Sequence, residues 1–191
     1  MSNGLSKQRE SYNLRGIQIL VLEDFPFMAD LMTSMLREFN VGKVITTCSV
    51  QGAQEAVNLR NINGPPLNHI DLVITDLLPP QEDGLKFMKW LRTHKEEPVS
   101  FLPILFCSAH ASMRVVLSGR DTGANEILVK PLTAEKLAQR LLYIIDKPRP
   151  YIKSSAFFGP DRRRQTNSEQ KVERRTLKPE DMKVTHESEA A

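Results

Sequence analysis

Five polar side chains of this sequence stand where short apolar runs end, and their types suit the chemistry of phosphate. Glu23 and Asp24 follow the run IQILVL, and Asp76 follows IDLVIT. Ser108 follows LPILFC, and Lys130 closes EILVK. A carboxylate at the end of a buried strand costs free energy unless a partner compensates its charge. Three carboxylates, a hydroxyl and an ammonium would compensate one another if the fold brought them together.

Crowded carboxylates predict a divalent cation and a nucleophile. Mg²⁺ prefers a few carboxylates, water and phosphate oxygens, and it would relieve the repulsion among the acids. One carboxylate could then attack a phosphoryl group and form an aspartyl phosphate. Lys130 would neutralise phosphoryl oxygens, and the Ser108 hydroxyl would donate a hydrogen bond to one of them. Asp76 ends its strand within reach of the cation and of Lys130.

Five strand-and-helix units would position these side chains. The apolar runs predict buried strands at 17–22, 43–48, 70–75, 102–107 and 126–130. Helical spacing follows each of them, at 25–39, 50–60, after Gly84, at 111–119 and at 133–146. This alternation predicts an α/β fold with a doubly wound, five-stranded parallel sheet. Ligands of such sheets bind at the carboxyl ends of the strands, where the five polar residues lie.

Three residues mark the expected helix ends. Thr133 is predicted to be the N-cap of the last helix, and Asp83 is predicted to cap the helix that follows Gly84. The run ASMRVVLSG predicts a short helix that ends at Gly119.

Four motifs together resemble the receiver domain of bacterial response regulators. They are VLED, LVITDLLPPQEDG, PILFCSA and GANEILVKP, and they match in order and spacing over about residues 16–147. The resemblance implies a flavodoxin-like (βα)5 fold in which Asp76 is phosphorylated by a histidine kinase or a phosphotransfer protein. It also implies that Glu23, Asp24, Asp76 and the backbone carbonyl of Leu78 hold Mg²⁺, and that the Lys130–Pro131 bond is cis.

The sequence departs from the family pattern at two places. Pro79 stands where the family usually has methionine. Ile127 stands where an aromatic switch residue is common, so the usual coupled motion of Ser108 and an aromatic ring lacks its ring. The sequence therefore does not predict how phosphorylation would change the output surface. We also predict that Leu78 shields the acyl phosphate and makes hydrolysis slow, with His110 as an alternative that would orient an attacking water.

The chain divides into a polar N-terminal segment (1–15), a receiver domain (16–147) and a basic, mostly irregular tail (148–191). Residues 147–191 hold 11 Lys/Arg and 7 Asp/Glu, which accounts for the net charge of +3. We interpret the tail as solvated and anchored by Phe157 and Phe158. A protein-docking segment and a nucleic-acid contact are the alternatives, the latter disfavoured because acids are interleaved and no DNA-binding motif is recognisable.

Output is expected through protein contact at the fourth helix, fifth strand and fifth helix, around residues 115–142. These elements neighbour Ser108 and Lys130, and homodimerisation through them stays open. The protein would not be a classical enzyme, although it would catalyse its own phosphorylation and slow aspartyl-phosphate hydrolysis. The two cysteines, the polar N-terminus and the lack of a long apolar stretch indicate a cytoplasmic protein with no membrane span.

Three other functions compete with this interpretation. A receiver-like scaffold that is never phosphorylated is favoured by Ile127 and opposed by the complete acid set. A nucleic-acid-binding regulator would act through the basic tail. A metal-dependent phosphatase of similar topology is the weakest, because no second acid stands two residues after Asp76.

Overall fold

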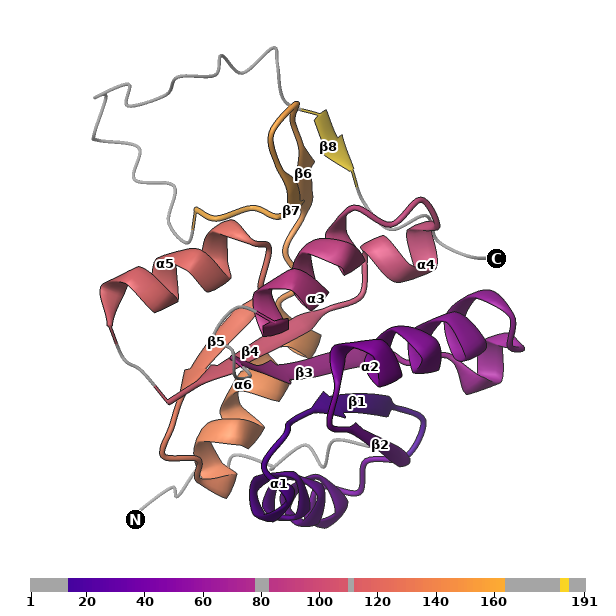
Figure 1. The fold of residues 1–191 in the computed structure, drawn as a ribbon, viewed down its shortest axis with the longest axis vertical. Helices are drawn as coiled ribbons and strands as arrows, with labels where there is room; N and C mark the ends of the chain where they lie inside the picture. Colours follow the sequence, from indigo (N-terminus) through magenta and orange to yellow (C-terminus); the bar gives the residue numbers. More distant parts are fainter. Residues whose placement is uncertain (1–13, 78–82, 110–111, 164–182, 186–191) are drawn as a thin grey trace, which may run out of the picture.

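The computed structural model describes residues 14–77, 83–109, 112–163 and 183–185. A five-stranded parallel sheet with the order β2-β1-β3-β4-β5 forms its centre (Figure 1). The predicted α/β doubly wound fold is thereby confirmed. The strands are β1 (Gln18–Leu22), β2 (Lys43–Thr47), β3 (Leu72–Asp76), β4 (Ile104–Ser108) and β5 (Glu126–Val129).

Helices cover both faces of the sheet, with α1 and α6 on one face and α2, α3 and α5 on the other (Figure 1). A π-helical turn continues α2, and two short helical segments lie in the connections. The helices are α1 (Pro26–Glu38), α2 (Val50–Val57), η1 (Asn58–Ile62), η2 (Pro66–Asn68), α3 (Asp83–Arg92), α4 (Glu97–Ser100), α5 (Met113–Asp121) and α6 (Ala134–Asp146). The predicted fourth and fifth helices therefore correspond to α5 and α6.

Two apolar cores lie on opposite faces of the sheet. Successive side chains of a strand point to opposite faces, so β1 sends Ile19 and Val21 toward α1 and α6. Leu20 and Leu22 point to the other core, which includes Phe87 of α3. Burial on both faces explains why the strands are apolar without alternation. No helix of the described residues is both long and apolar enough to span a bilayer.

The ends of two helices can be compared with prediction. Thr133 caps α6 as expected, because its Oγ1 accepts a hydrogen bond from the Lys136 amide at 3.3 Å. The predicted end of a helix at Gly119 was wrong, since α5 continues to Asp121. A Cβ on Gly119 would lie 2.5 Å from the Phe106 ring, so this glycine allows α5 to approach β4. Helix α3 begins at Asp83, whose side chain lies outside the described residues.

Part of the segment expected to be irregular forms a β-hairpin. Strand β6 (Tyr151–Lys153) pairs antiparallel with β7 (Phe158–Pro160) and with β8 (Lys183–Thr185). The hairpin packs on the receiver, because the rings of Tyr151 and Phe158 contact the Phe101 ring, with centroids 4.8 and 5.1 Å from its own. Residue pattern within 148–163 does not predict this order, because the surface that stabilises the hairpin belongs to residues far away in sequence. The anchoring role predicted for Phe158 agrees with this packing.

Candidate functional site

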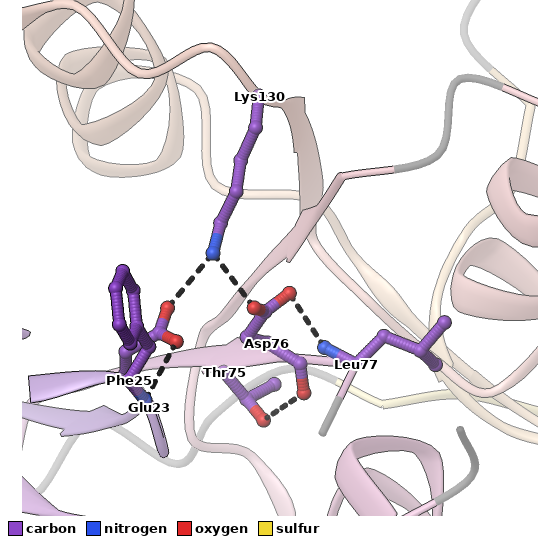
Figure 2. Close-up of polar contacts among 6 residues, drawn as sticks. All are labelled: Glu23, Phe25, Thr75, Asp76, Leu77 and Lys130. Atoms are coloured by element: carbon purple, nitrogen blue, oxygen red, sulfur yellow. Dashed lines mark hydrogen bonds and ion pairs between the residues drawn. The ribbon is translucent and has the colours of Figure 1, made fainter. Parts of the chain in front are cut away.

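Glu23, Asp76 and Lys130 meet at the carboxyl ends of the strands. Lys130 Nζ lies 2.7 Å from Asp76 Oδ2 and 2.9 Å from Glu23 Oε2 (Figure 2). Asp76 is the last residue of β3, Glu23 follows β1, and Lys130 follows β5. Because β1 and β3 are neighbours, both acids lie side by side, and the long lysine side chain reaches them across the end of β4.

Backbone hydrogen bonds hold Glu23 and Lys130 in place. The Glu23 amide donates to the Thr47 carbonyl at 3.0 Å, which extends the pairing of β1 with β2. The Lys130 amide donates to the Ser108 carbonyl at 2.8 Å, which does the same for β5 and β4. The Lys130–Pro131 peptide bond is cis, as the resemblance implied.

Neighbouring amides also bind the carboxylates. Asp76 Oδ1 accepts a hydrogen bond from the Leu77 amide at 2.7 Å, so one oxygen faces this amide and the other faces the lysine (Figure 2). Glu23 Oε1 accepts from the Phe25 amide at 3.3 Å. These amides fix the direction of both side chains. Residue type does not predict these contacts, because backbone donors leave no signal in it.

Gly84 lies in close contact with the backbone of Asp76, the candidate nucleophile. A Cβ at this position would lie 1.9 Å from the Asp76 carbonyl oxygen and 3.3 Å from Thr75 Oγ1. The start of α3 can approach the end of β3 only because residue 84 has no side chain. Gly84 is therefore a positioning residue, although its place in the sequence predicts only a helix boundary.

The site carries more negative than positive charge. Burial and the nearby Asp76 carboxylate raise the pKa of Glu23 above its usual value, against the hydrogen bond from Lys130. Burial alone would lower the pKa of Lys130, but its hydrogen bonds to Asp76 and Glu23 raise it, so the amine stays protonated. Burial likewise raises the pKa of Cys107, which keeps this neighbouring thiol protonated and unreactive.

The other predicted site residues take different positions. Ser108 is fully buried at the end of β4, and Ile127 packs partly buried against the second core. Glu23, Asp76 and Lys130 form the lysine cluster, in which side-chain ion pairs join Glu23 and Asp76 to Lys130. Asp24 is exposed, and within the described residues no hydrogen bond or ion pair joins it to this cluster. Leu78 and His110 lie outside the described residues.

The carboxylate oxygens at the carboxyl ends of the strands suit a hard divalent cation. Two carboxylates converge on one ammonium, and oxygen ligands with excess negative charge are those that Mg²⁺ prefers. The described ranges contain no group of three acidic, histidine or cysteine side chains arranged around a common point. Glu23 and Asp76 would therefore form the anionic part of a metal site, to be completed by further oxygen atoms.

A profile of the response regulator receiver domain matches residues 19–142 of the chain. The chain belongs to the response regulator receiver family. Members of this family work in two-component signalling with histidine kinases or phosphotransfer proteins, and they bind Mg²⁺. The matched residues run from β1 into α6 and contain the whole lysine cluster.

Relatives of this receiver occur in bacteria and plants. The chemotaxis protein CheY-3 of Vibrio cholerae is 26% identical over 70% of this chain and 95% of its own length. The two-component response regulator ARR12 of Arabidopsis thaliana is 31% identical over a match that covers 64% of this chain and 18% of its own length.

Solved structures show the same fold. A putative response regulator from Chloroflexus aurantiacus superposes with a TM-score of 0.59 at 26% identity, covering 69% of this chain and 98% of that one. The chemotaxis protein CheY4 of V. cholerae superposes with a TM-score of 0.54 at 23% identity, covering 67% and 98%.

Proposed function

We propose that this receiver accepts a phosphoryl group on Asp76 from a histidine kinase or a phosphotransfer protein. The observation that carries the proposal is the Lys130 ammonium held at 2.7 Å from Asp76 and 2.9 Å from Glu23. A protonated amine beside the acceptor can neutralise phosphoryl oxygens as charge develops on them. The receiver domain proper is proposed to comprise residues 16–147.

In the transfer step an oxygen of the Asp76 carboxylate attacks phosphorus. The new O–P bond forms while the bond from phosphorus to the donor's imidazole nitrogen breaks, and the electron pair stays on that nitrogen. Lys130 would exchange its hydrogen bond with Asp76 Oδ2 for one with a phosphoryl oxygen. The Leu77 amide would hold the other carboxylate oxygen, as it holds Oδ1 now.

Mg²⁺ would be held by Glu23, Asp24, Asp76 and the carbonyl of Leu78, and when bound it supplies positive charge against the phosphoryl oxygens. Glu23 and Asp76 already form the anionic pair. Exposed Asp24 follows Glu23 directly and would act through water or by turning inward.

Ser108 would pass the phosphorylation signal to the face formed by α5, β5 and α6. It ends β4 and pairs in register with Val129, the residue before Lys130. A change at the Ser108 hydroxyl would therefore reach β5 through one pair of neighbouring residues. We propose that a partner protein in the cytoplasm recognises this face and that switching proceeds without the aromatic ring that Ile127 replaces.

The test is phosphorylation by acetyl phosphate and Mg²⁺, read by intact-protein mass spectrometry. Wild type should gain one phosphoryl group, and peptide mapping should place it on Asp76. Asp76→Asn should gain none, whereas the matched control Asp30→Asn, an exposed acid on α1, should behave like wild type. Equal behaviour of wild type and Asp76→Asn would refute the proposal and favour an unphosphorylated scaffold, the function that Ile127 would suit.

The lifetime of the acyl phosphate is a second quantity to measure. We propose that Leu78 shields it from water, so Leu78→Asn should lose the phosphoryl group faster than wild type. His110→Ala provides the comparison, because a water-orienting histidine would make that variant slower to hydrolyse. Faster decay in wild type than in Leu78→Asn would contradict the shielding role.

A further inference from the structure

The C-terminal hairpin is fastened to the connection between α5 and β5. Arg162, which follows β7, lies with its Nη1 2.9 Å from Oδ1 of Asp121, the last residue of α5. Arg149, which precedes β6, donates from Nη1 to the carbonyl of Asn125 at 3.0 Å, one residue before β5 begins. Both ends of the hairpin therefore bind this connection, and the hairpin lies beside α5 (Figure 1).

The backbones of the hairpin and of this connection also meet. A Cβ on Gly159 of β7 would lie 3.1 Å from the Cα of Gly123, so the two chains could not be this close with a side chain between them. Gly123 has a φ of +98°, and its carbonyl accepts hydrogen bonds from Nε of Arg92 at 3.1 Å and from Nη2 at 2.9 Å. The connection is thus in contact with Arg92 of α3 and with β7 of the hairpin. A shift of the connection toward the hairpin would displace β7.

Asp121 stands at an unfavourable place for an acid. It is the last residue of α5, where the helix dipole carries partial negative charge and favours cations. Arg120 and Arg162 both pair with its carboxylate, each at 2.9 Å. Because Arg162 belongs to the C-terminal segment, docking of the hairpin adds positive charge at this end of α5.

Strand β5 connects the docked hairpin with the lysine cluster. It spans Glu126–Val129, so Asn125 directly precedes it and Lys130 directly follows it. The five residue steps from Asn125 to Lys130 correspond to about 16 Å of strand. The hairpin therefore holds one end of β5, whereas the ion pairs of Lys130 with Asp76 and Glu23 hold the other.

We propose that the docked hairpin restrains the receiver against switching, and that phosphorylation of Asp76 loosens the hairpin. The proposal rests on the phosphoryl-acceptor function proposed above. A phosphoryl group would draw Lys130 away from its present partners Asp76 and Glu23, and this would pull on β5. The contacts of the hairpin fit the present arrangement of α5 and β5, so a shift of either element costs part of their free energy. Docking and phosphorylation therefore oppose each other.

A hairpin with a purely structural role would behave differently. It would cover Phe101 and Arg92 in both states of the receiver, and loosening it would leave the acceptor site unchanged. Under the proposed restraint the coupling free energy is reciprocal. Whatever loosens the hairpin must then favour a ligand on Asp76, and a ligand on Asp76 must loosen the hairpin by the same factor.

The first test is isothermal titration of the full-length chain with beryllofluoride and Mg²⁺, because beryllofluoride takes the place of a phosphoryl group on a carboxylate. Arg162→Gln should bind beryllofluoride about three-fold more tightly than wild type, and Arg162→Lys should return to the wild-type affinity. The matched control Arg163→Gln, whose partner Asp161 lies in the same segment, should also behave like wild type. Equal affinities of wild type and Arg162→Gln would overturn the proposal.

Two further variants loosen the same junction by different means. Asp121→Asn removes the carboxylate that Arg162 binds, so the double variant with Arg162→Gln should gain no more affinity than either single variant. Gly159→Ala would place a methyl group against Gly123 and should tighten beryllofluoride binding without any change of charge. Fully additive effects of the two charge variants would mean that their ion pair does not carry the coupling, which contradicts the proposal.

The reverse direction is read by amide hydrogen exchange of the full-length chain. Saturating beryllofluoride should speed exchange in β6 and β7 of wild type about three-fold relative to β1, and Asp76→Asn should show no such response. Unchanged or slower exchange in the hairpin of wild type would refute the restraint. Faster exchange in Arg162→Gln and Gly159→Ala without tighter beryllofluoride binding would identify the hairpin as purely structural.

These outcomes distinguish failure of the restraint from failure of the phosphoryl-acceptor function. Wild type that binds beryllofluoride no better than Asp76→Asn would overturn both. Wild type that binds it through Asp76, with an affinity and a hairpin that do not respond to each other, would overturn the restraint alone.

Discussion

At the carboxyl ends of the strands Lys130 lies between two carboxylates, whereas at the amino ends Arg92 is surrounded by neutral oxygens. Arg92 is 5% exposed, and its guanidinium donates five hydrogen bonds at 2.7–3.1 Å. Its acceptors are the carbonyls of Ser100, Leu102 and Gly123 and the side-chain oxygen of Asn125. The ring of Tyr151 covers the guanidinium, 5.2 Å away.

The two cations therefore differ in what they leave unsatisfied. All donors of Arg92 have fixed backbone or amide partners, so this charge joins α3, α4, β5 and the hairpin and has nothing to exchange. Lys130 faces one more negative charge than it can neutralise, and its partners are side chains that can turn. An excess of anions beside a mobile amine suits ligand exchange, whereas a saturated guanidinium suits structural support.

The largest effect is expected from removing the saturated cation. Arg92→Met should lower the free energy of unfolding by about 3–5 kcal/mol, because four buried oxygen atoms lose their donors. Urea denaturation measures this, with the exposed α5 residue in Arg114→Met as the control. Folded Arg92→Met protein should still be phosphorylated on Asp76. A loss below about 1 kcal/mol would show that water replaces the guanidinium.

A smaller effect is expected from loosening the hairpin at the same end. The Tyr151 hydroxyl donates to the Phe101 carbonyl at 2.8 Å in a buried setting. Tyr151→Phe should cost about 1–2 kcal/mol and should speed amide hydrogen exchange in β6 and β7 more than in β1. Tyr143→Phe on α6 provides the matched control. Unchanged exchange in the hairpin would mean that aromatic packing alone holds it.

Removing a charge from the lysine cluster should have the opposite sign. Asp76→Asn relieves repulsion with Glu23 and leaves Lys130 one full partner, so without metal the protein should gain up to about 1 kcal/mol of stability. Added Mg²⁺ should shrink this difference, because it stabilises wild type more than the variant. Thermal unfolding with and without Mg²⁺ measures both. Destabilisation of metal-free Asp76→Asn would show that the cluster supports the fold, as the Arg92 site does.

The smallest effect is expected from the ion pairs of Asp121, whose contribution to stability is lost only in acid. Burial alone would raise the pKa of Asp121, but hydrogen bonds from Arg162 and Arg120 lower it below its usual value of 3.8. A lowered folded-state pKa contributes stability above pH 3.8 that is lost as pH falls through the folded value. Because the carboxylate is 47% exposed, solvent screening limits this to under about 1 kcal/mol. Asp121→Asn should remove that part of the acid dependence, as followed by urea midpoints between pH 5 and pH 3.

Sequence pattern alone was sufficient to predict the sheet and most of the residues of the candidate site. Buried parallel strands need apolar residues on both faces, so their positions can be recognised locally, and their carboxyl ends must share one edge. Glu23, Asp76 and Lys130 could therefore be expected together without knowledge of any distance. The five expected strands and the N-cap at Thr133 are local in the same sense.

Tertiary structure alone decided which charges are saturated and which are available. Arg92 and Arg114 both stand within predicted helices, yet one is buried among carbonyls and the other is exposed. Contacts between distant residues decide how the hairpin docks on Phe101. They also decide that α5 continues beyond Gly119. Residue type and spacing encode local periodicity, but burial and charge balance are sums over neighbours that only the folded chain brings together.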